Sequence, residues 1–250
     1  LVAPVKISKK TGKKLKIFLE TIILAKTNTT LNPKNLSSNA MQLILDAKHH
    51  DPFHFLGLHE ASKKSFIFRT FLPHADKVWL KVVNKWVPLE MTHSDGLFTL
   101  EGENQPSAPC LLKIEHAGGS YETHDAYSFM PFITEDELHL FAEGNLNLAY
   151  QMLGSHVCEL QGVHGVRFAV WAPSAERVSV VGNFNQWDGR VNPMRVRGAS
   201  GVWEIFIPNL KANDLYKFEI RNRHTGAIFS KIDPYSREFE LRPGTASRIT

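Results

Sequence analysis

Apolar and polar positions alternate most regularly in residues 166–189. Every second residue from Val166 to Val170 is apolar, which predicts a strand with one buried face. Pro173 follows, and this strand should end there because proline cannot donate to a strand ladder. Residues 177–181 alternate in the same way and run into a polar turn at residues 182–189. The pattern therefore predicts two strands of a small antiparallel sheet followed by an exposed loop.

This pattern occurs a second time, earlier in the chain. Phe66–Val78 aligns with Val166–Val178, and three pairs carry the match: Pro73 with Pro173, Ala75 with Ala175, and Val78 with Val178. A looser alignment further on sets Leu112-Lys-Ile-Glu against Tyr216-Lys-Phe-Glu and Asp125-Ala-Tyr against Asp233-Pro-Tyr. Each copy has about seven short strands separated by turn residues, the spacing of an immunoglobulin-like sandwich. The chain is therefore predicted to be all-β, with two such sandwiches in tandem.

A short helix is expected between the two copies. Thr134 and Glu137 have the spacing of a capping box, and the helix that they begin should end near Gly144. We therefore expect the first sandwich at residues 41–133, a helical connector acting as a rigid spacer at 134–148, and the second sandwich at 149–250. One or two helical turns should begin at Met41.

Residues 1–40 differ in charge from the rest of the chain. Eight lysines and one glutamate give them a net charge of +7, so the total of +4 leaves −3 for residues 41–250. We interpret them as a basic leader that is disordered or foreign to the natural protein, with Met41 as the true start. A short amphipathic helix at residues 14–25 and an export signal are the alternatives. No nucleic-acid partner is expected, because a basic surface would depend on this leader alone.

The composition of the whole chain is that of an ordinary soluble protein. Hydrophobic residues make up 43% and charged residues 22% of the chain, and no apolar run approaches the ~18 residues of a membrane span, so no membrane partner is expected. Cys110 and Cys158 lack metal-like spacing and fit reduced thiols of a cytoplasmic protein. Residues 49–59 contain four histidines at irregular spacing, and Pro52 and Gly57 mark a turn there, so we expect no metal at this segment.

The motifs of the second copy resemble a known family. They are Trp-Ala-Pro at residues 171–173, Val-Ser-Val-Val-Gly-Asn-Phe-Asn-Gln-Trp-Asp-Gly-Arg at 178–190, Asp-Pro-Tyr at 233–235 and Leu-Arg-Pro-Gly-Thr-Ala-Ser at 241–247. The first two resemble the starch- and glycogen-associated carbohydrate-binding module of the α-amylase superfamily. Over roughly residues 46–250 the chain is similar to the N-terminal part of bacterial glycogen (1,4-α-glucan) branching enzymes. The resemblance implies early-set sandwiches and a catalytic barrel that would begin after residue 250.

Catalysis is not expected of the chain as given. Glycosyl transfer with retention needs two carboxylates about 5–5.5 Å apart across the scissile bond. The candidate carboxylates, Asp188, Glu204, Glu219 and Asp233, each fall in a predicted strand or turn without a partner. The resembled family carries its catalytic groups on the barrel. The chain also lacks a nucleophile elbow and a phosphate loop, and we expect no cofactor.

Binding of an α-glucan is the better-supported chemistry. A glucan is held by an indole under the apolar face of the sugar and by polar side chains at its hydroxyls. Trp187 lies in an asparagine-rich turn with Asn185 nearby, and Lys217 lies on a strand. In glycan-binding members of the resembled module a tryptophan of this turn and a lysine of this strand contact the glucan. We therefore predict Trp187, Lys217 and Asn185 as the glucan-binding residues.

One departure from the family pattern weakens the predicted site. Glycan-binding members have a second tryptophan before the Asp-Pro, where this chain reads Ile228-Phe-Ser-Lys-Ile. Half of a ~200 Å² indole contributes roughly 2–3 kcal/mol before the cost of association, so binding should be weak. An equally favoured alternative makes Trp187 an anchor against the barrel. Trp171 and Trp203 are predicted to be core residues, and Trp79 and Trp86 core or edge residues.

Three functions remain open from the sequence. The first is the non-catalytic N-terminal part of a branching enzyme, whose partners are an α-glucan (glycogen or a maltooligosaccharide) and the missing catalytic barrel. The second is a stand-alone glucan-binding module. The third is an interaction scaffold whose faces are all packing surfaces. The runs at residues 233–235 and 242–247, which lead into the barrel in the resembled family, favour the first.

Overall fold

The computed structural model describes residues 33–62 and 65–250. The chain divides into two compact units, residues 1–39 and 40–250, and the contacts reported below lie within the second. Residues 1–32, and with them the interpretation of the basic leader and its alternative helix at 14–25, lie outside the described residues. Helix α2 (Pro33–Leu45) contains the helical turns expected from Met41 but begins eight residues earlier.

The last turn of α2 belongs to the hydrophobic core. Ile44 and Leu45 are 3% and 7% exposed, and the partly buried Met41 packs against the same cluster. A short 3-10 helix, η1 (Pro52–His54), follows, with Asp51 accepting a hydrogen bond from the amide of Phe53 at its start. This entry segment is therefore held by side-chain burial and by a cap.

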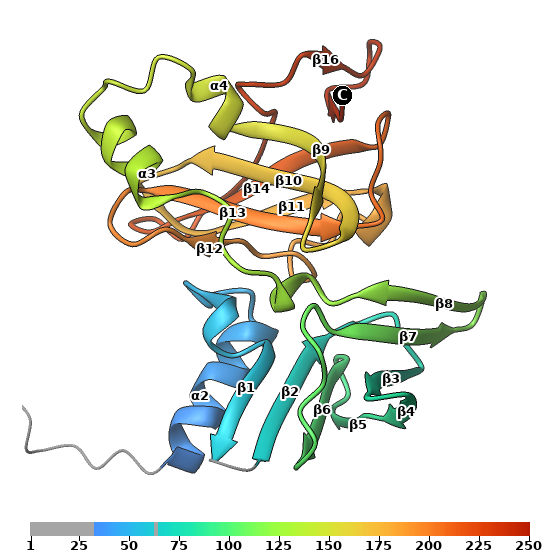
Figure 1. Cartoon of the computed structure of the whole chain (residues 1–250). Helices are drawn as coiled ribbons and strands as arrows, with labels where there is room; N and C mark the ends of the chain where they lie inside the picture. Colours follow the sequence, from blue (N-terminus) through green and yellow to red (C-terminus); the bar gives the residue numbers. More distant parts are fainter. Residues whose placement is uncertain (1–32, 63–64) are drawn as a thin grey trace, which may run out of the picture. The chain divides into compact units, whose positions relative to one another are not determined.

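The first sandwich consists of two antiparallel sheets (Figure 1). One sheet has the order β1 (Gly57–Ser62), β2 (Ser65–Phe71), β6 (Leu97–Gly102), β5 (Glu90–His93), and the other has the order β4 (Lys85–Pro88), β3 (Lys77–Val82), β7 (Leu111–His116), β8 (Gly119–His124). Their facing residues form one cluster in which Phe68, Leu80 and Leu112 are at most 1% exposed. The alternation of apolar residues along β2 and β3 produces this buried face.

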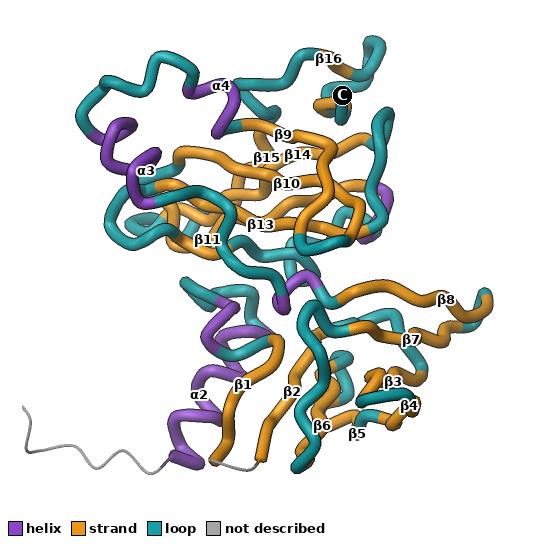
Figure 2. Tube along the Cα trace, viewed as in Figure 1, coloured by secondary structure: helices purple, strands orange, loops and turns teal. Residues whose placement is uncertain are grey.

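The second sandwich repeats the arrangement. Its first sheet has the order β9 (Gly154–Leu160), β10 (Val163–Trp171), β13 (Val202–Pro208), β12 (Arg195–Val196), which is the order of β1, β2, β6 and β5. Its second sheet joins β11 (Ala175–Gly182), β14 (Leu215–Asn222), β17 (Ser247–Arg248) and β16 (Glu238–Phe239), and β15 (Ile228–Lys231) pairs with β14. The predicted all-β fold with two tandem sandwiches is confirmed, and strands dominate the described chain in Figure 2.

The strand register corrects one part of the internal alignment. Leu80 lies opposite Leu112, whereas Val180 lies opposite Phe218, so Leu112 corresponds to Phe218 and not to Tyr216. Counting back two residues places Cys110 at the position of Tyr216. The sequence alignment matched the Lys-x-Glu pattern that both strands share, but hydrogen-bond pairing sets which side chains occupy equivalent places.

The connector packs on the second sandwich. It contains α3 (Glu135–Ala142), while η2 (Ala126–Ser128) precedes it and α4 (Ala149–Met152) follows it. The predicted capping box is present, with the Glu137 amide donating to Thr134 Oγ1 and the Thr134 amide to Glu137 Oε2. Leu138 packs in one cluster with Ala169 of β10 and Val202 of β13. The expectation of a spacer is therefore wrong, because the apolar side of α3 covers a sheet face.

Two of the predicted core tryptophans have different environments. Trp203 is 1% exposed and lies in the main core, as predicted. Trp171 is 54% exposed, and its prediction as a core residue is wrong. It is the last residue of β10 and follows the buried Val170, so its side chain points to the opposite face, where its ring contacts Phe141 edge to face. Trp79 and Trp86 are both half-buried.

Candidate functional site

The loop that joins β11 to β12 carries the candidate site. Val178 and Val180 of β11 and Tyr216 and Phe218 of β14 all lie in the core, so the residues between them face outward. The loop folds back over this outward face, and its Gly189 carbonyl accepts hydrogen bonds from the side chains on it. A rigid pair of strands therefore positions a loop, a common arrangement for binding residues.

A buried arginine anchors the loop. Arg177 is 1% exposed, and its guanidinium donates to the Gly189 carbonyl and to Glu219 Oε1, each at 2.6 Å. The Ser179 hydroxyl donates to the same carbonyl at 2.6 Å. A Cβ at Gly189 would collide with the Glu219 carboxylate, so glycine lets the loop approach the strand without displacing that side chain.

Trp187 is held in an unusual backbone conformation. Gln186 and Trp187 have φ angles of +57° and +60°, the left-handed region that bulky residues rarely adopt. The Trp187 amide donates to the Gly182 carbonyl at 2.9 Å, and its indole Nε1–H donates to Asn183 Oδ1 at 2.8 Å. The side chain is 39% exposed. The indole N–H fixes the ring while part of the ring surface faces solvent. The backbone strain at Gln186 and Trp187 is typical of ligand-binding segments.

Asn185 is placed differently from Trp187. It is 5% exposed, and its side-chain carbonyl accepts a hydrogen bond from the Gly182 amide at 2.9 Å. Its Nδ2 donates to the Val180 carbonyl at 2.8 Å and to Asn192 Oδ1 at 2.9 Å. Three hydrogen bonds within the loop therefore use this amide, and the geometry is that of a residue that shapes the turn.

Lys217 lies on β14, on the same outward face as the loop. It pairs with Val181, the neighbour of Gly182, to which the Trp187 amide is hydrogen-bonded. Lys217 Nζ donates to Thr245 Oγ1 at 2.6 Å, which leaves two of its three donors for a ligand. Strand pairing thus brings Lys217 and the tryptophan loop to one face, and Thr245 orients the ammonium group.

The expected gap in the aromatic platform has a structural basis. Ser230 of β15 pairs with Glu219, and Ile228 pairs with Arg221, so these two β15 residues share the outward face with Lys217. Phe229 pairs with Ile220 and points to the opposite side by the alternation of the strand. Neither Ile228 nor Ser230, the two outward residues of β15, carries an aromatic ring.

The charges beside Trp187 are paired. Asp188 and Arg190 form a bidentate ion pair, with Arg190 Nη2 donating to Asp188 Oδ2 at 2.8 Å and Nε to Oδ1 at 3.0 Å. Burial raises the pKa of Asp188, but the hydrogen bonds from Arg190 outweigh burial and the pKa is lowered overall. The edge of the site is therefore electrically neutral, as suits an uncharged ligand.

The four carboxylates considered for catalysis all have structural partners. Glu204 is fully buried beside Arg197 and accepts from the Ile133 amide at 3.0 Å, and burial raises its pKa. Burial likewise raises the pKa of Asp233, which accepts a hydrogen bond from Tyr216. Glu219 binds Arg177, and Asp188 binds Arg190. Each of the four carboxylates therefore has a structural partner.

Three features of the site were missed or only partly seen from the sequence. Asn183 was noted only as a neighbour of Trp187, yet it accepts the indole hydrogen bond. Arg177 and Thr245, which anchor the loop and orient Lys217, were not singled out. The anchor from Arg177 to Gly189 joins residues 12 apart and the contact of Lys217 with Thr245 joins residues 28 apart, and no local motif reveals either of them. No group of three or more His, Cys, Asp or Glu that could hold a metal ion occurs in residues 33–62 and 65–250, and none of the helices there is long and apolar enough to cross a membrane.

The fold and this loop define a class of protein. Residues 152–236 match the family model for carbohydrate-binding module 48 (isoamylase N-terminal domain), which covers β9 to β15 of the second sandwich and Trp187. Residues 37–127 match the model for the N-terminal domain of the alpha-1,4-glucan branching enzyme GlgB. The chain is a tandem β-sandwich protein that contains a module of the carbohydrate-binding class.

Curated relatives identify the family. The 1,4-alpha-glucan branching enzyme GlgB of Methylobacillus flagellatus is 57% identical over 207 residues, which are 83% of this chain and 28% of that protein. The enzyme of the same name from Nitrosospira multiformis is 49% identical over 213 residues, again 83% and 28%. The chain belongs to the GlgB family and corresponds to its N-terminal region, spanning little more than a quarter of these relatives.

A solved structure with a similar fold adds no functional information. A pullulanase of Klebsiella pneumoniae complexed with maltotriose is 17% identical, with a TM-score of 0.35, and the match covers 78% of this chain and 21% of that one. A TM-score this low supports no conclusion about site or activity.

Proposed function

We propose that this chain is the glucan-positioning, non-catalytic part of a 1,4-α-glucan branching enzyme, with Trp187 and Lys217 contacting the glucan. The observation that carries the proposal is Trp187 itself, a partly exposed indole fixed by Asn183 in a strained loop of a carbohydrate-binding module. Lys217 supplies donors for sugar hydroxyls on the same strand pair. Asn185 acts indirectly in this proposal, by shaping the loop.

The matching relatives support branching of α-glucans as the activity of the whole enzyme. Each relative reported above carries the name 1,4-alpha-glucan branching enzyme, and this chain spans 28% of it. A catalytic domain elsewhere in such an enzyme would cut and rejoin the chains, while this region holds the glucan. The domain limits 41–133, 134–148 and 149–250 are part of the same proposal.

Co-sedimentation with glycogen tests the binding site. Trp187→Ala should reduce the fraction of protein that sediments with glycogen, because the ring surface is lost. Trp171→Ala is a matched control: Trp171 is 54% exposed but lies on β10, away from the loop, and its loss should leave sedimentation unchanged. Equal retention of both variants and the unaltered protein would assign Trp187 to packing.

An activity assay tests the non-catalytic assignment. The purified chain should leave the iodine-stained spectrum of amylose unchanged over a long incubation, since each candidate carboxylate is held in a structural ion pair or hydrogen bond. A blue-to-red shift that grows with protein concentration would contradict the assignment.

One observation favours a second role for the same sandwich. Ile228, Ile232, Phe239 and Leu241 are between 48% and 84% exposed and follow one another along the last part of the chain. Exposed apolar side chains concentrated in one segment are typical of a surface that contacts another domain. We propose this segment as a packing surface for the catalytic barrel, which agrees with the scaffold alternative without requiring Trp187.

A further inference from the structure

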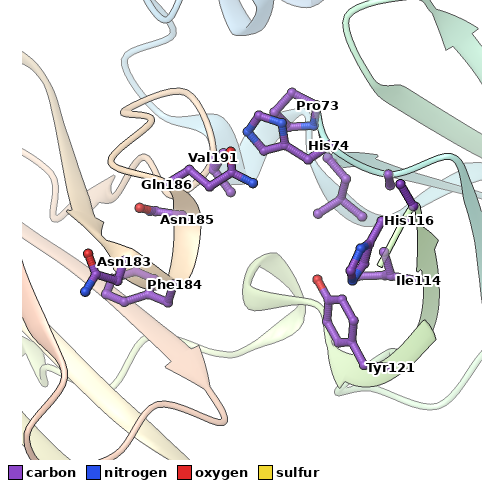
Figure 3. A pocket seen from close by; sticks show the side chains of 13 residues that line it. Pro73, His74, Ile114, His116, Tyr121, Asn183, Phe184, Asn185, Gln186 and Val191 are labelled. Atoms are coloured by element: carbon purple, nitrogen blue, oxygen red, sulfur yellow. The ribbon is translucent and has the colours of Figure 1, made fainter. Parts of the chain in front are cut away.

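A cleft lies between the Trp187 loop and the first sandwich. It has a volume of about 520 Å³ and is walled on one side by residues 183–186 and on the other by residues 72–75 and the β7–β8 hairpin. A second hollow of about 320 Å³ adjoins it and shares Tyr121, Phe184 and Val191. Figure 3 shows Phe184 and Gln186 on one side of the opening and His74, His116 and Tyr121 on the other. This size falls in the range of small-molecule sites.

The lining of the cleft suits a neutral, polyhydroxylated ligand. The larger hollow has no Lys, Arg, Asp or Glu in its wall, and its polar groups are amides, imidazoles and the Tyr121 hydroxyl. An anion would need fixed positive charge, and a metal cation would need carboxylates or several imidazoles held together. Tyr121, 48% exposed with its hydroxyl directed into the opening, offers a ring face of the kind on which sugars pack.

One oxygen of a buried carboxyl group beside the cleft lacks a hydrogen-bond partner within the described residues. Asp125 lines the smaller hollow and is 4% exposed, and its Oδ2 accepts no hydrogen bond within the described residues. In the second sandwich the equivalent carboxylate, Asp233, accepts a hydrogen bond from the Tyr216 hydroxyl. Cys110 occupies the position of that tyrosine in the first sandwich, and a thiol is a weak donor. Buried polar atoms are rarely left unpaired, so this oxygen marks a difference between the two sandwiches at the wall of the smaller hollow.

We propose that this cleft is a second subsite for an α-1,4-glucan, with Tyr121 under the sugar face and Gln186 at its hydroxyls. The choice of glucan among neutral ligands rests on the proposed function. The loop residue Asn183 lines the cleft and also accepts the hydrogen bond of the Trp187 indole, so one loop separates the two subsites. A glucan chain that crosses this loop would contact both.

Nuclear magnetic resonance of the ¹⁵N-labelled chain distinguishes the two subsites. Maltohexaose is the probe, the indole Nε1–H of Trp187 reports the outward face, and the amides of His116 and Tyr121 report the cleft. Both sets of signals should shift in a saturable way. Tyr121→Ala should weaken the affinity seen by the His116 amide about fivefold or more while the Trp187 signal titrates as before.

Matched controls make the outcome specific. Tyr150→Ala removes a tyrosine that is 53% exposed on α4, outside the cleft, and should change neither titration. Cellohexaose, with β-1,4 links, should leave the cleft amides unshifted. Circular dichroism of each variant checks that the fold is intact.

The results separate this inference from the proposed function. A shift of the Trp187 indole without any shift of the cleft amides overturns the second subsite and leaves the proposed function standing. A shift of the cleft amides alone supports the subsite and overturns the role of Trp187. An absence of both shifts overturns both, and equal effects of Tyr121→Ala and Tyr150→Ala overturn the assignment of Tyr121.

Discussion

The Tyr216 hydroxyl donates a hydrogen bond to Asp233 Oδ2 at 2.5 Å, and the first sandwich lacks this contact. Its equivalent carboxyl group, Asp125, stands beside Cys110, whose pKa is raised to about 12 by burial and by Asp125 itself. The two copies therefore share a buried aspartate but differ in the residue that can satisfy it. This difference has a consequence for the pH dependence of stability.

Asp125→Asn should flatten part of the pH dependence of unfolding. Burial raises the pKa of Asp125 from 3.8 to about 8, against smaller opposing hydrogen bonds from Tyr127 and Thr70. Between pH about 4 and 8 the unfolded chain releases this proton while the native chain retains it. The contribution of Asp125 is thus fully present in acid and is lost as the pH rises through 8. The free energy of unfolding of the wild type, minus that of Asp125→Asn, should fall over this window.

Urea denaturation at half-unit pH steps from 5 to 9 measures the difference. Subtracting the free energy of unfolding of Asp125→Asn from that of the wild type removes the contributions of groups common to both proteins. These groups include the buried Glu204 and Asp233, whose pKa values are raised. Parallel pH profiles of the two proteins would show that Asp125 has an ordinary pKa.

Trp203→Ala should cost far more stability than Trp171→Ala. Trp203 is 1% exposed and its removal leaves a cavity in the main core, which costs about 3–5 kcal/mol. Trp171 has the same side chain but is 54% exposed, so its removal leaves no buried cavity. Its Nε1 donates a hydrogen bond to the Ser200 carbonyl at 3.2 Å. Thermal unfolding of both variants provides the comparison. Similar midpoints would contradict the placement of Trp171 on the face of β10 that points away from the main core.

Gly189→Ala should weaken both the fold and glycogen retention. The added methyl group would displace the Glu219 carboxylate and with it the hydrogen bonds that Arg177 makes to the loop. Gly118→Ala is the control for stability alone, because its Cβ would meet only the movable ring of His116. A loss of about 1 kcal/mol would lower the unfolding midpoint by roughly 2–4 °C in a domain of this size. Unchanged glycogen retention by Gly189→Ala would show that this anchor does not position Trp187.

Glu204→Ala should destabilise the connector. Glu204 is 0% exposed and pairs with Arg197 at 3.2 Å and with Arg195 at 3.6 Å, so its removal leaves two largely buried guanidinium groups without their carboxylate. Breaking a buried pair in this way costs about 3–5 kcal/mol.

Glu135→Ala is the matched control for Glu204. Glu135 pairs with the same Arg197, but its side chain is 86% exposed, so the loss should stay within about 1 kcal/mol. Chemical denaturation of both variants measures the two costs. Equal costs would contradict a structural role of burial at Glu204.

Lys217→Ala should reduce glycogen retention less than Trp187→Ala does. It removes hydrogen-bond donors but leaves the indole surface, which contributes most of the apolar contact. Lys231→Ala is the control: Lys231 is exposed on β15 and pairs with Phe218, on the opposite side of the strand from Ser230. Co-sedimentation that falls equally for both lysine variants would indicate a nonspecific charge effect.

The two-sandwich fold and the short helix could be predicted from local patterns. Alternation from Val166 to Val170 and the matching segment Phe66–Val78 each encode a strand with one buried face, because side chains alternate between the two faces of a sheet. The Thr134–Glu137 capping box could be predicted because both partners lie within one turn. Trp187 could be predicted from its asparagine-rich turn, and its contact with glucan remains a prediction.

Only the tertiary structure decided what each side chain meets. The register of β7 and β14 placed Cys110, and not Leu112, at the position of Tyr216, since pairing is set by hydrogen bonds between strands distant in sequence. Trp171 and Trp203 look alike in sequence, but Trp203 faces the main core and Trp171 lies half-exposed on the opposite side of its sheet, against Phe141. The same holds for Asn185 and Trp187, neighbours in one turn of which only Trp187 is substantially exposed, because strand and loop geometry, not residue type, determines which atoms are buried.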